Sequence, residues 1–284
     1  MVEHTIRTFP SLGAMIDYVS GPCDVPAWDR KSHTVSPERT QFTGTKSWDE
    51  AMSITHRWDE GIARIDAMRV AISDADRAPR TTLRKSVAPP GRIDIGGIAA
   101  GDPAAGYLRR RQVMTVKRQQ GKVIRVLVNT GCSAGVTTDT IMRRGAAILA
   151  LVDMLEARGF RADIMGCAPI TAPRARASRI MEHRWIVKRP EERVSLAALA
   201  FGLAHPSMHR RVVFAARECE SAADRTYFDI VRTMGSSATS LMADEVIASG
   251  GIYLDRIPTD SPFEDDDSAR AWVKGEVERI MSGR

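Results

Sequence analysis

Residues 123–135 read VIRVLVNTGCSAG and set the architecture of the second half of the chain. The segment Val123–Val128 is mostly apolar and rich in β-branched side chains, a composition typical of a buried strand. The polar, glycine-containing loop Asn129–Gly135 follows it at once. Because ligands of open α/β sheets collect where the strands end, we expect any binding site to lie at this loop.

A long helix is expected directly after this loop. Thr137 or Thr138 can cap its start, and Gly159 is placed to end it after Arg158. Residues 160–165 then return to the strand pattern. A strand, a long helix and a strand within about 45 residues form the layout of a parallel βαβ unit with a right-handed crossover. The sequence therefore predicts the α/β class.

The remainder of this half continues to alternate strands with helices. Further strands are expected at residues 184–188 and 252–257, a helix at 196–203, and either a strand or a helix at 211–215. Three aspartates at 265–267 precede the last helix, and we interpret them as a helix start rather than a metal site because the helix dipole favours negative charge there. The predicted fold is a mainly parallel sheet flanked by helices, of the Rossmann-like kind.

The first part of the chain predicts an N-terminal helical region over residues 1–80. Within it, Ser47 and Glu50 have the spacing of a capping box ahead of apolar residues. Residues 81–121 are rich in proline and glycine, which disfavours long regular elements and indicates a connecting arm. The α/β domain is then expected over residues 122–284.

Positive charge is unevenly distributed along this basic chain, whose formal net charge is +6. Two clusters of basic residues are candidates for nucleic-acid contact, because concentrated positive charge attracts a polyanion. Solvated surfaces carry similar runs without any partner. The first cluster contains Arg109, Arg110, Arg111, Lys117, Arg118 and Lys122, and the second contains Arg174, Arg176, Arg179 and Arg184.

The cysteines and the apolar segments indicate the compartment. Cys23, Cys132, Cys167 and Cys219 are spread singly without a Cys-x-x-Cys pair, a pattern typical of free thiols in a reducing environment. The N-terminus lacks the basic start and apolar run of a secretory signal, and the longest apolar stretch is too short to span a bilayer. We therefore expect a soluble cytoplasmic protein without membrane contact.

The loop Asn129–Gly135 differs from the known phosphate-binding motifs. It lacks the Gly-Lys-Ser/Thr of a Walker loop and the glycine spacing of the dinucleotide fingerprint, although its backbone amides could still bind phosphate. Cys132 could gain thiolate character beside a helix start. A nucleophilic cysteine would also need a base, and the candidates are His183, His205 and His209.

Three stretches of the sequence together carry a family resemblance. They are FTGTKSWDEA at residues 42–51, DIGGIAAGDP at 94–103, and the segment 126–159, which contains RRGAAILALV. They resemble an uncharacterised family found in phages and mobile elements. This resemblance covers most of the chain and implies a phage or plasmid setting, with no assigned activity to carry over.

The α/β half also resembles von Willebrand A-like domains. Their metal-ion-dependent adhesion site begins with Asp-x-Ser-x-Ser at the end of this strand, where the present chain has Asn129, Gly131 and Ser133. Two of these positions lack the oxygen-rich, charged ligands that a hard cation requires. Asp163 or Asp255 could restore the charge if the order of the strands brought one of them near. We expect no divalent cation here, and no other metal or cofactor.

The candidate ligand loop therefore comprises Asn129, Gly131, Cys132 and Ser133, and no complete catalytic constellation is assigned to the chain. We expect a non-enzymatic binding or assembly protein of a phage or mobile element, built on a von Willebrand A-like domain. Its partner would be a protein or an assembly component, in the host cytoplasm or on the virion. The alternatives are a nucleic-acid-binding replication or packaging accessory protein and an enzyme such as a hydrolase or nuclease.

Overall fold

The computed structural model describes residues 4–55, 58–73, 83–86, 92–93, 107–110, 121–173, 179–258 and 260–283. Strands and helices are interspersed along the chain. In order, the elements are β1 (Thr5–Phe9), α1 (Leu12–Ser20), η1 (Ala27–Asp29), η2 (Lys31–His33), α2 (Pro37–Thr43), α3 (Trp48–Ser53), α4 (Asp59–Ser73), β2 (Leu83–Ser86), β3 (Arg92–Ile93), β4 (Tyr107–Arg110), β5 (Val123–Asn129), α6 (Thr138–Ala157), β6 (Arg161–Thr171), β7 (Ile180–Lys188), α7 (Leu196–Leu199), η3 (Ala200–Ala204), η4 (Met208–Val213), α8 (Phe214–Glu218), α9 (Ala222–Tyr227), β8 (Ser236–Ser237), α10 (Ala243–Ala248), β9 (Ile252–Leu254) and α11 (Asp266–Ser282).

One mixed sheet forms the centre of the molecule, in the order β1-β7-β6-β5-β9, with β8 paired to β6. β5 is parallel to both of its neighbours, β6 and β9, and β1 is parallel to β7. β6 runs antiparallel to β7 and to β8. The expected α/β class, with a mostly parallel sheet flanked by helices, is confirmed.

The β5-α6-β6 unit forms as the local signals predict. Val126 and Val128 are fully buried, in keeping with a central strand. The side chain of Thr137 caps α6 by accepting a hydrogen bond from Thr140 N at 3.2 Å. Gly159 follows the helix with a φ of 93°, a left-handed conformation that glycine adopts without strain. The capped helix and its glycine stop thus return the chain to the sheet, where β6 runs parallel to β5.

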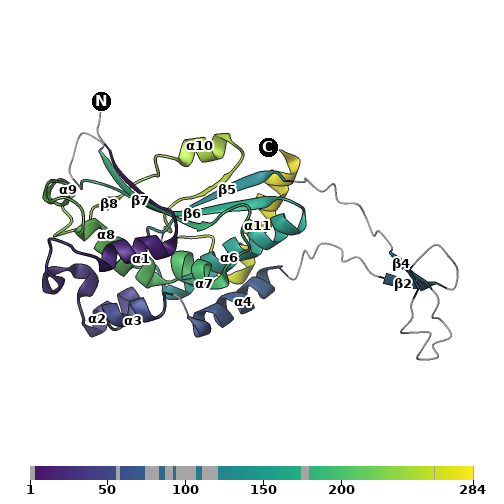
Figure 1. The fold of residues 1–284 in the computed structure, drawn as a ribbon, viewed down its shortest axis with the longest axis horizontal. Coiled ribbons are helices and arrows are strands. Elements are labelled where there is room, and N and C mark those ends of the chain that lie inside the picture. Colours follow the sequence, from purple (N-terminus) through teal and green to yellow (C-terminus); the bar gives the residue numbers. More distant parts are fainter. Residues whose placement is uncertain are drawn as a thin grey trace.

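The helices cover the two faces of the sheet unequally. Figure 1 shows α1, α4, α6 and α7 on one side and the short α10 on the other. The main core lies under the large layer, where α6 packs against β5, β6 and α11 through Ile148, Ile164 and Val273. A small core of Leu127, Cys167 and Val246 lies under α10. Within the described ranges, no helix has the length and apolar character needed to cross a membrane.

The N-terminal region contributes a strand as well as helices, which differs from the purely helical region expected for residues 1–80. β1 is the edge strand of the central sheet, and all five of its residues pair with β7. The helices that were expected do form, and Ser47 caps α3 by accepting from Glu50 N at 3.1 Å. Phe9 and Leu12 share a core with Trp185 of β7, so this region packs into the common fold. A five-residue edge strand has too short a pattern to reveal a partner so far along the chain.

Part of the proline- and glycine-rich segment 81–121 forms a second, small sheet. Its three short strands are antiparallel in the order β2-β4-β3. The other residues of this segment, apart from Gly121, lie outside the described part of the chain. The strands are four, two and four residues long, in agreement with a composition that disfavours long elements.

The segment after β7 is helical and is interrupted once. Residues 211–215, for which a strand or a helix was expected, are helical in η4 and α8. The preceding helical run ends at Ala204, and His205 is extended, with φ −91° and ψ 131°. Because proline disfavours the helical conformation of the residue before it, Pro206 accounts for this break. The last helix begins as expected, since Asp265 caps α11 by accepting from Ser268 N at 2.7 Å.

Two glycine substitutions should change stability in opposite directions. A Cβ on Gly145 of α6 would lie 2.3 Å from Ala204 Cβ and 3.2 Å from its Cα, so Gly145→Ala should lower the free energy of unfolding by about 1–3 kcal/mol. Gly275 of α11 has open space around it, so Gly275→Ala should raise that free energy by up to about 1 kcal/mol through helix propensity. Urea denaturation measures both, and a gain in stability from both substitutions would contradict the close α6–η3 contact.

Candidate functional site

The loops that follow β5 and β9 run side by side at one edge of the sheet. Asn129 is the last residue of β5, and Cys132 forms a parallel bridge with Ile257 beyond the end of β9. Ile257 N donates to Gly131 O at 2.9 Å. Parallel strands bring their carboxyl ends to the same edge, so the predicted ligand loop meets a segment more than a hundred residues further along the chain.

The Asn129 side chain joins three segments at this edge. Its amide nitrogen donates to Ala238 O and to Asp255 Oδ1, both at 3.1 Å. Its amide oxygen accepts from Gly131 N at 3.0 Å. The residue is only 1% exposed. A Cβ on Gly131 would approach Asn129 Oδ1 to 3.0 Å, so this close turn favours glycine.

Two carboxylates, Asp163 and Asp255, could restore negative charge to the loop. In the structure Asp255 lies beside the loop, and Asp163 does not. Asp163 is on β6, where it pairs with Arg125 at 3.5 Å. Besides Asn129, Asp255 Oδ1 accepts from the hydroxyl of Tyr253 at 2.9 Å and from Arg256 N at 2.8 Å. One carboxylate oxygen therefore receives three hydrogen bonds from its own chain.

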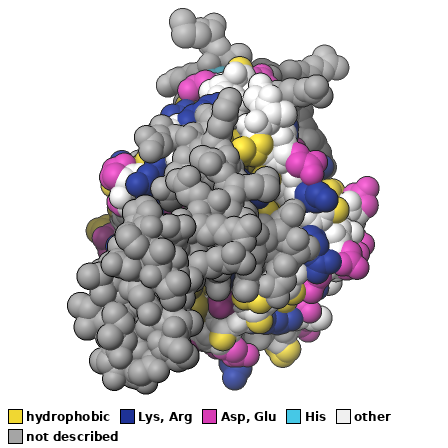
Figure 2. Space-filling view, turned by 90° about the vertical axis from the view of Figure 1, so that its right-hand side faces the viewer, with side chains coloured by type: hydrophobic (Ala, Val, Ile, Leu, Met, Phe, Trp, Pro, Cys, Tyr) yellow, Lys and Arg dark blue, Asp and Glu magenta, His cyan; other side chains and the backbone are white. Residues whose placement is uncertain are grey.

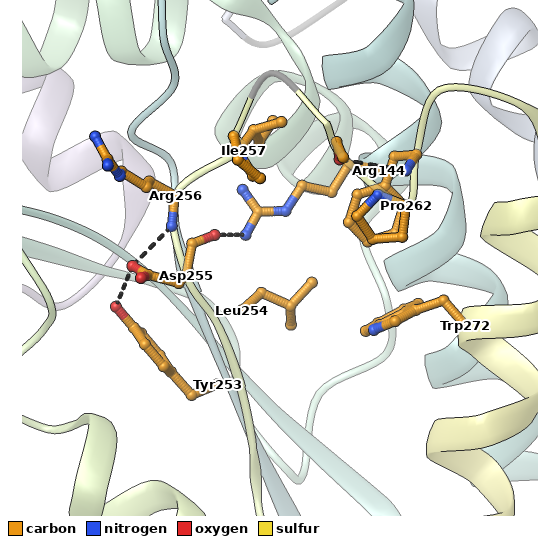
Figure 3. Close-up of a pocket in the computed structure, with 11 residues that line it drawn as sticks. Arg144, Tyr253, Leu254, Asp255, Arg256, Ile257, Pro262 and Trp272 are labelled. Carbon is orange, nitrogen blue, oxygen red and sulfur yellow. Dashed lines mark hydrogen bonds between the residues drawn. The ribbon is translucent and has the colours of Figure 1, made fainter.

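A buried arginine connects the two strand ends from the helix side. Arg144 of α6 donates from Nη1 to Asn129 O at 2.8 Å and from Nη2 to Asp255 O at 2.6 Å, and Figure 3 shows its guanidinium directed at Asp255. It is 2% exposed, and burial lowers the pKa of Arg144 to about 10. The group therefore stays cationic at neutral pH.

Sequence reasoning missed Arg144, although a signal was present. The residue lies one helical turn before Ile148 and two turns before Leu151, and both of these are fully buried. A charged residue on the apolar stripe of a helix must be buried with partners or lie at the end of the core. Helical spacing thus indicates that this guanidinium is buried, but the sequence does not show which groups it contacts.

The charges at this edge oppose cation binding. A positive Arg144 sits behind both strand ends, and like charges repel strongly where solvent is excluded. Asp255 Oδ1 already accepts three hydrogen bonds. Across the part of the chain that the structure describes, no three His, Cys, Asp or Glu side chains gather in a way that could hold a metal. The arrangement is chemically suited to join the strand ends without an ion.

Cys132 does not have the surroundings of an activated thiol. It packs with Val136 and Ile257 in a small apolar cluster. Burial raises the pKa of the Cys132 thiol, and the opposing effects of Arg210 and Arg144 are smaller. These surroundings do not favour the thiolate character considered from the sequence, because desolvation outweighs the neighbouring positive charge.

The three candidate histidines lie in different places. His183 Nε2 bonds to Glu220 Oε1 at 2.9 Å, and His205 packs among aromatic rings. His209 approaches the loop, with Nδ1 3.4 Å from Thr130 Oγ1. Burial lowers the pKa of His209 well below its usual value, so the ring is neutral. None of these histidine contacts provides a base for the cysteine.

Ser133 lies on the exposed side of the loop beside a second buried arginine, which sequence reasoning also missed. Arg210 of η4 donates from Nη2 to Ser133 O at 3.0 Å and from Nη1 to Phe42 O at 2.6 Å. Its guanidinium carbon is 4.1 Å from the centre of the Phe42 ring. A pocket of about 370 Å³ opens there, lined by Glu38, Gln41, Phe42, Ala134, Gly135, Val136, Thr137, Thr138 and Arg210.

The structure describes only some residues of the two predicted basic clusters. Arg109 and Arg110 are in β4, Lys122 is exposed before β5, and Arg111, Lys117, Arg118, Arg174 and Arg176 lie outside the described residues. Arg179 pairs with Asp224 at 2.5 Å, and Arg184 pairs with Glu182 at 3.0 Å. On the face in Figure 2, the described basic side chains are interspersed with acidic ones. The second cluster is therefore partly neutralised within the chain.

Divalent cations should leave the protein's stability unchanged. Melting curves with and without millimolar magnesium, manganese or calcium are expected to coincide, because a cation bound only to the native state would raise the midpoint by mass action. Asn129 is the only asparagine of the sequence, so selective amide labelling provides a single side-chain NMR reporter, whose signals should not move. An upward midpoint shift that Ser133→Ala abolishes would instead reveal a working cation site.

Comparisons with known proteins identify a family and no activity. Neither the curated proteins nor the solved structures include a match to this chain. One family model matches residues 1–282, nearly the whole sequence. The chain therefore belongs to the family described as a domain of unknown function, DUF7192.

Proposed function

We propose that this chain is a non-enzymatic binding or assembly protein of a phage or mobile element, built on a von Willebrand A-like domain. It engages a protein partner at the edge where β5 and β9 end, and it does so without a divalent cation. The sequence resemblance supports the phage or mobile-element setting, and the contacts at this edge support the binding mode.

The observation that carries the proposal is the joining of the two strand ends by Arg144. Its guanidinium binds the main-chain oxygens of Asn129 and Asp255, and the side chains of those residues bind each other. In an adhesion site of the resembling domains, the cation and its ligands occupy this position. Here a fixed positive charge and paired polar groups hold the loops in one geometry, as a preorganised binding surface requires.

The exposed part of the loop provides that surface. Three consecutive residues, Ser133, Ala134 and Gly135, are exposed, and Arg256 is exposed on the neighbouring loop. Small side chains allow a partner's backbone to approach closely, and the buried residues beneath them fix their position. The raised pKa of Cys132 further favours binding over nucleophilic catalysis, which needs an ionised or activated nucleophile.

Partner capture tests this function with a matched pair of variants. Tagged protein from cells carrying the phage or mobile element should recover a stoichiometric protein partner, and washing with EDTA should not release it. Ala134→Arg should reduce recovery by roughly tenfold or more, because a bulky cation blocks the exposed loop. Ala157→Arg should have no effect, because Ala157 is also exposed but lies at the other end of α6.

Three results would count against the proposal. They are a clean monomer without a partner, release of the partner by EDTA, and equal loss of the partner from both variants. Each contradicts a separate part of it, namely the binding role, the independence from cations, and the location at the loop.

Nucleic-acid binding is the second candidate function, and the small sheet favours it. In the register of β2 with β4, Arg84 is opposite Arg109 and Leu83 is opposite Arg110. Like charges directly opposite each other destabilise a strand pair, whereas a bound polyanion offsets their repulsion. This pairing places Arg109 of the first cluster opposite Arg84, a further basic residue on the adjacent strand.

Salt dependence tests this second function. If the small sheet binds DNA, affinity for a duplex should fall steeply between about 50 and 200 mM salt as counterions are released. Replacing Arg84 and Arg109 by Gln should reduce the slope of log K against log salt by about 1.8, the value for two phosphate contacts. The matched double variant Arg161→Gln with Arg256→Gln removes the same charge elsewhere and should keep the slope. Absence of binding at low salt would reject this function.

A further inference from the structure

We propose that the pocket beside the end of β9 binds a small carboxylate whose body is flat and apolar, with the carboxylate paired to Arg144. The pocket measures about 360 Å³ and lies between the segment after β9 and α11. Figure 3 shows the Arg144 guanidinium among the residues that line the pocket. Ile257 lies on one side of this guanidinium, and Leu254 and Trp272 lie on the other. This ligand site goes beyond the proposed protein-binding function, which uses the exposed loop.

The charge of Arg144 is the first argument. Buried charges are normally paired with an opposite charge. Arg144 is 2% exposed, and its two terminal nitrogens bind only main-chain oxygens. Its Nε has no hydrogen-bond partner, and the nearby Asp255 carboxylate acts on the guanidinium through its charge, while the hydrogen bond to Asp255 goes to the main-chain oxygen. A buried cation with an unused donor in a pocket wall fits an anionic ligand.

The walls of the pocket define the body of that ligand. Leu254, Ile257 and Pro262 contribute apolar surface. Phe263 and Trp272 meet edge to face, with ring centres 5.2 Å apart and planes at 71°. Aromatic and aliphatic walls with few polar groups are typical of small-molecule sites. A planar hydrocarbon ring would replace water on these surfaces at little cost.

Size and charge together restrict the ligand class. A volume of about 360 Å³ is near the lower end of the range of roughly 300–1,000 Å³ for ligand pockets. Arg144 and Arg256 together with Asp255 leave one net positive charge in the lining, which a single carboxylate balances at neutral pH. Nucleotides and other polyphosphates bring several charges and a larger body, so the pocket favours a monocarboxylate with a single ring.

The other pocket, beside Arg210, is less suited to an anion. It has a similar volume, about 370 Å³, and Arg210 Nε also has no hydrogen-bond partner. However, Glu38 lies in its wall, and hydrogen bonds with its own backbone and Ser36 lower the pKa of this carboxyl, so it is ionised at neutral pH. A negative wall opposes an anionic ligand, and in this pocket Arg210 is balanced by Glu38. The first pocket also contains a carboxylate, Asp255, but two arginines, Arg144 and Arg256, line it.

Benzoate is the probe for this site, with benzamide as its neutral analogue and acetate as its ringless analogue. The full chain is labelled with ¹⁵N-tryptophan, and the Trp272 indole signal is assigned among the five tryptophans with Trp272→Phe. Benzoate should shift that signal saturably with a dissociation constant in the millimolar range or below. Benzamide and acetate should bind at least about tenfold more weakly, since each lacks one of the two recognition elements.

Two variants locate the site by ligand-observed NMR. Arg144→Met should abolish benzoate binding, and Trp272→Leu should weaken it by roughly 2- to 12-fold through loss of the aromatic wall. Because Arg144 also holds the strand ends, the ligand series on the wild-type chain decides the question even if Arg144→Met fails to fold. Arg161→Gln, on the opposite edge of the sheet, should bind benzoate as the wild type does.

Specific outcomes would overturn the proposal. An unchanged Trp272 signal up to about 10 mM benzoate shows that the pocket takes no such ligand. Equal binding of benzoate and benzamide shows that Arg144 does not select charge, and equal shifts at all five tryptophans show non-specific association. These results are independent of partner capture, so failure of one function leaves the other measurable.

Discussion

A buried positive charge shared between two strand ends constrains the geometry of the whole carboxyl edge. Arg144 reaches from α6 to the main-chain oxygens of Asn129 and Asp255, so helix, central strand and neighbouring strand are joined at one point. Carbonyl oxygens carry only partial charges, and so they compensate the desolvated guanidinium less completely than a carboxylate would. The side-chain network of Asn129, the course of the loop after β5, and the pocket beside β9 all follow from the position of this one group.

Local patterns predicted the elements that local interactions form. Thr137, Gly159 and the β-branched run of β5 act within a few residues, and the β5-α6-β6 unit appears as expected. The pairing of β1 with β7 depends on residues about 176 positions apart, for example Thr5 with Met181. Periodicity within a single segment has no information about such partners, so the strand in the N-terminal region was missed.

In the candidate site, too, the features that depend on nearby residues could be predicted, whereas contacts between distant segments could not. The loop at the end of β5 could be placed from the sequence, whereas the approach of Asp255 required the order of the strands. The helix start near Cys132 is evident from the sequence, whereas the apolar packing around its thiol depends on Ile257 from a distant segment. The sequence shows the basic cluster around Arg179 but not the pairing of Arg179 with Asp224, 45 residues away.

The pairing of β1 with β7 has a consequence for synthesis of the chain. At roughly 5–20 residues per second, the ribosome makes β7 about 9–35 s after β1, so the first strand emerges long before its partner exists. During that interval the exposed Ile6 and the apolar Phe9 have no sheet to join, and an unpaired strand can associate with other chains. Arg7, between them, supplies the charge that discourages such pairing. The first strand of the chain is thus among the last parts of the sheet to be completed.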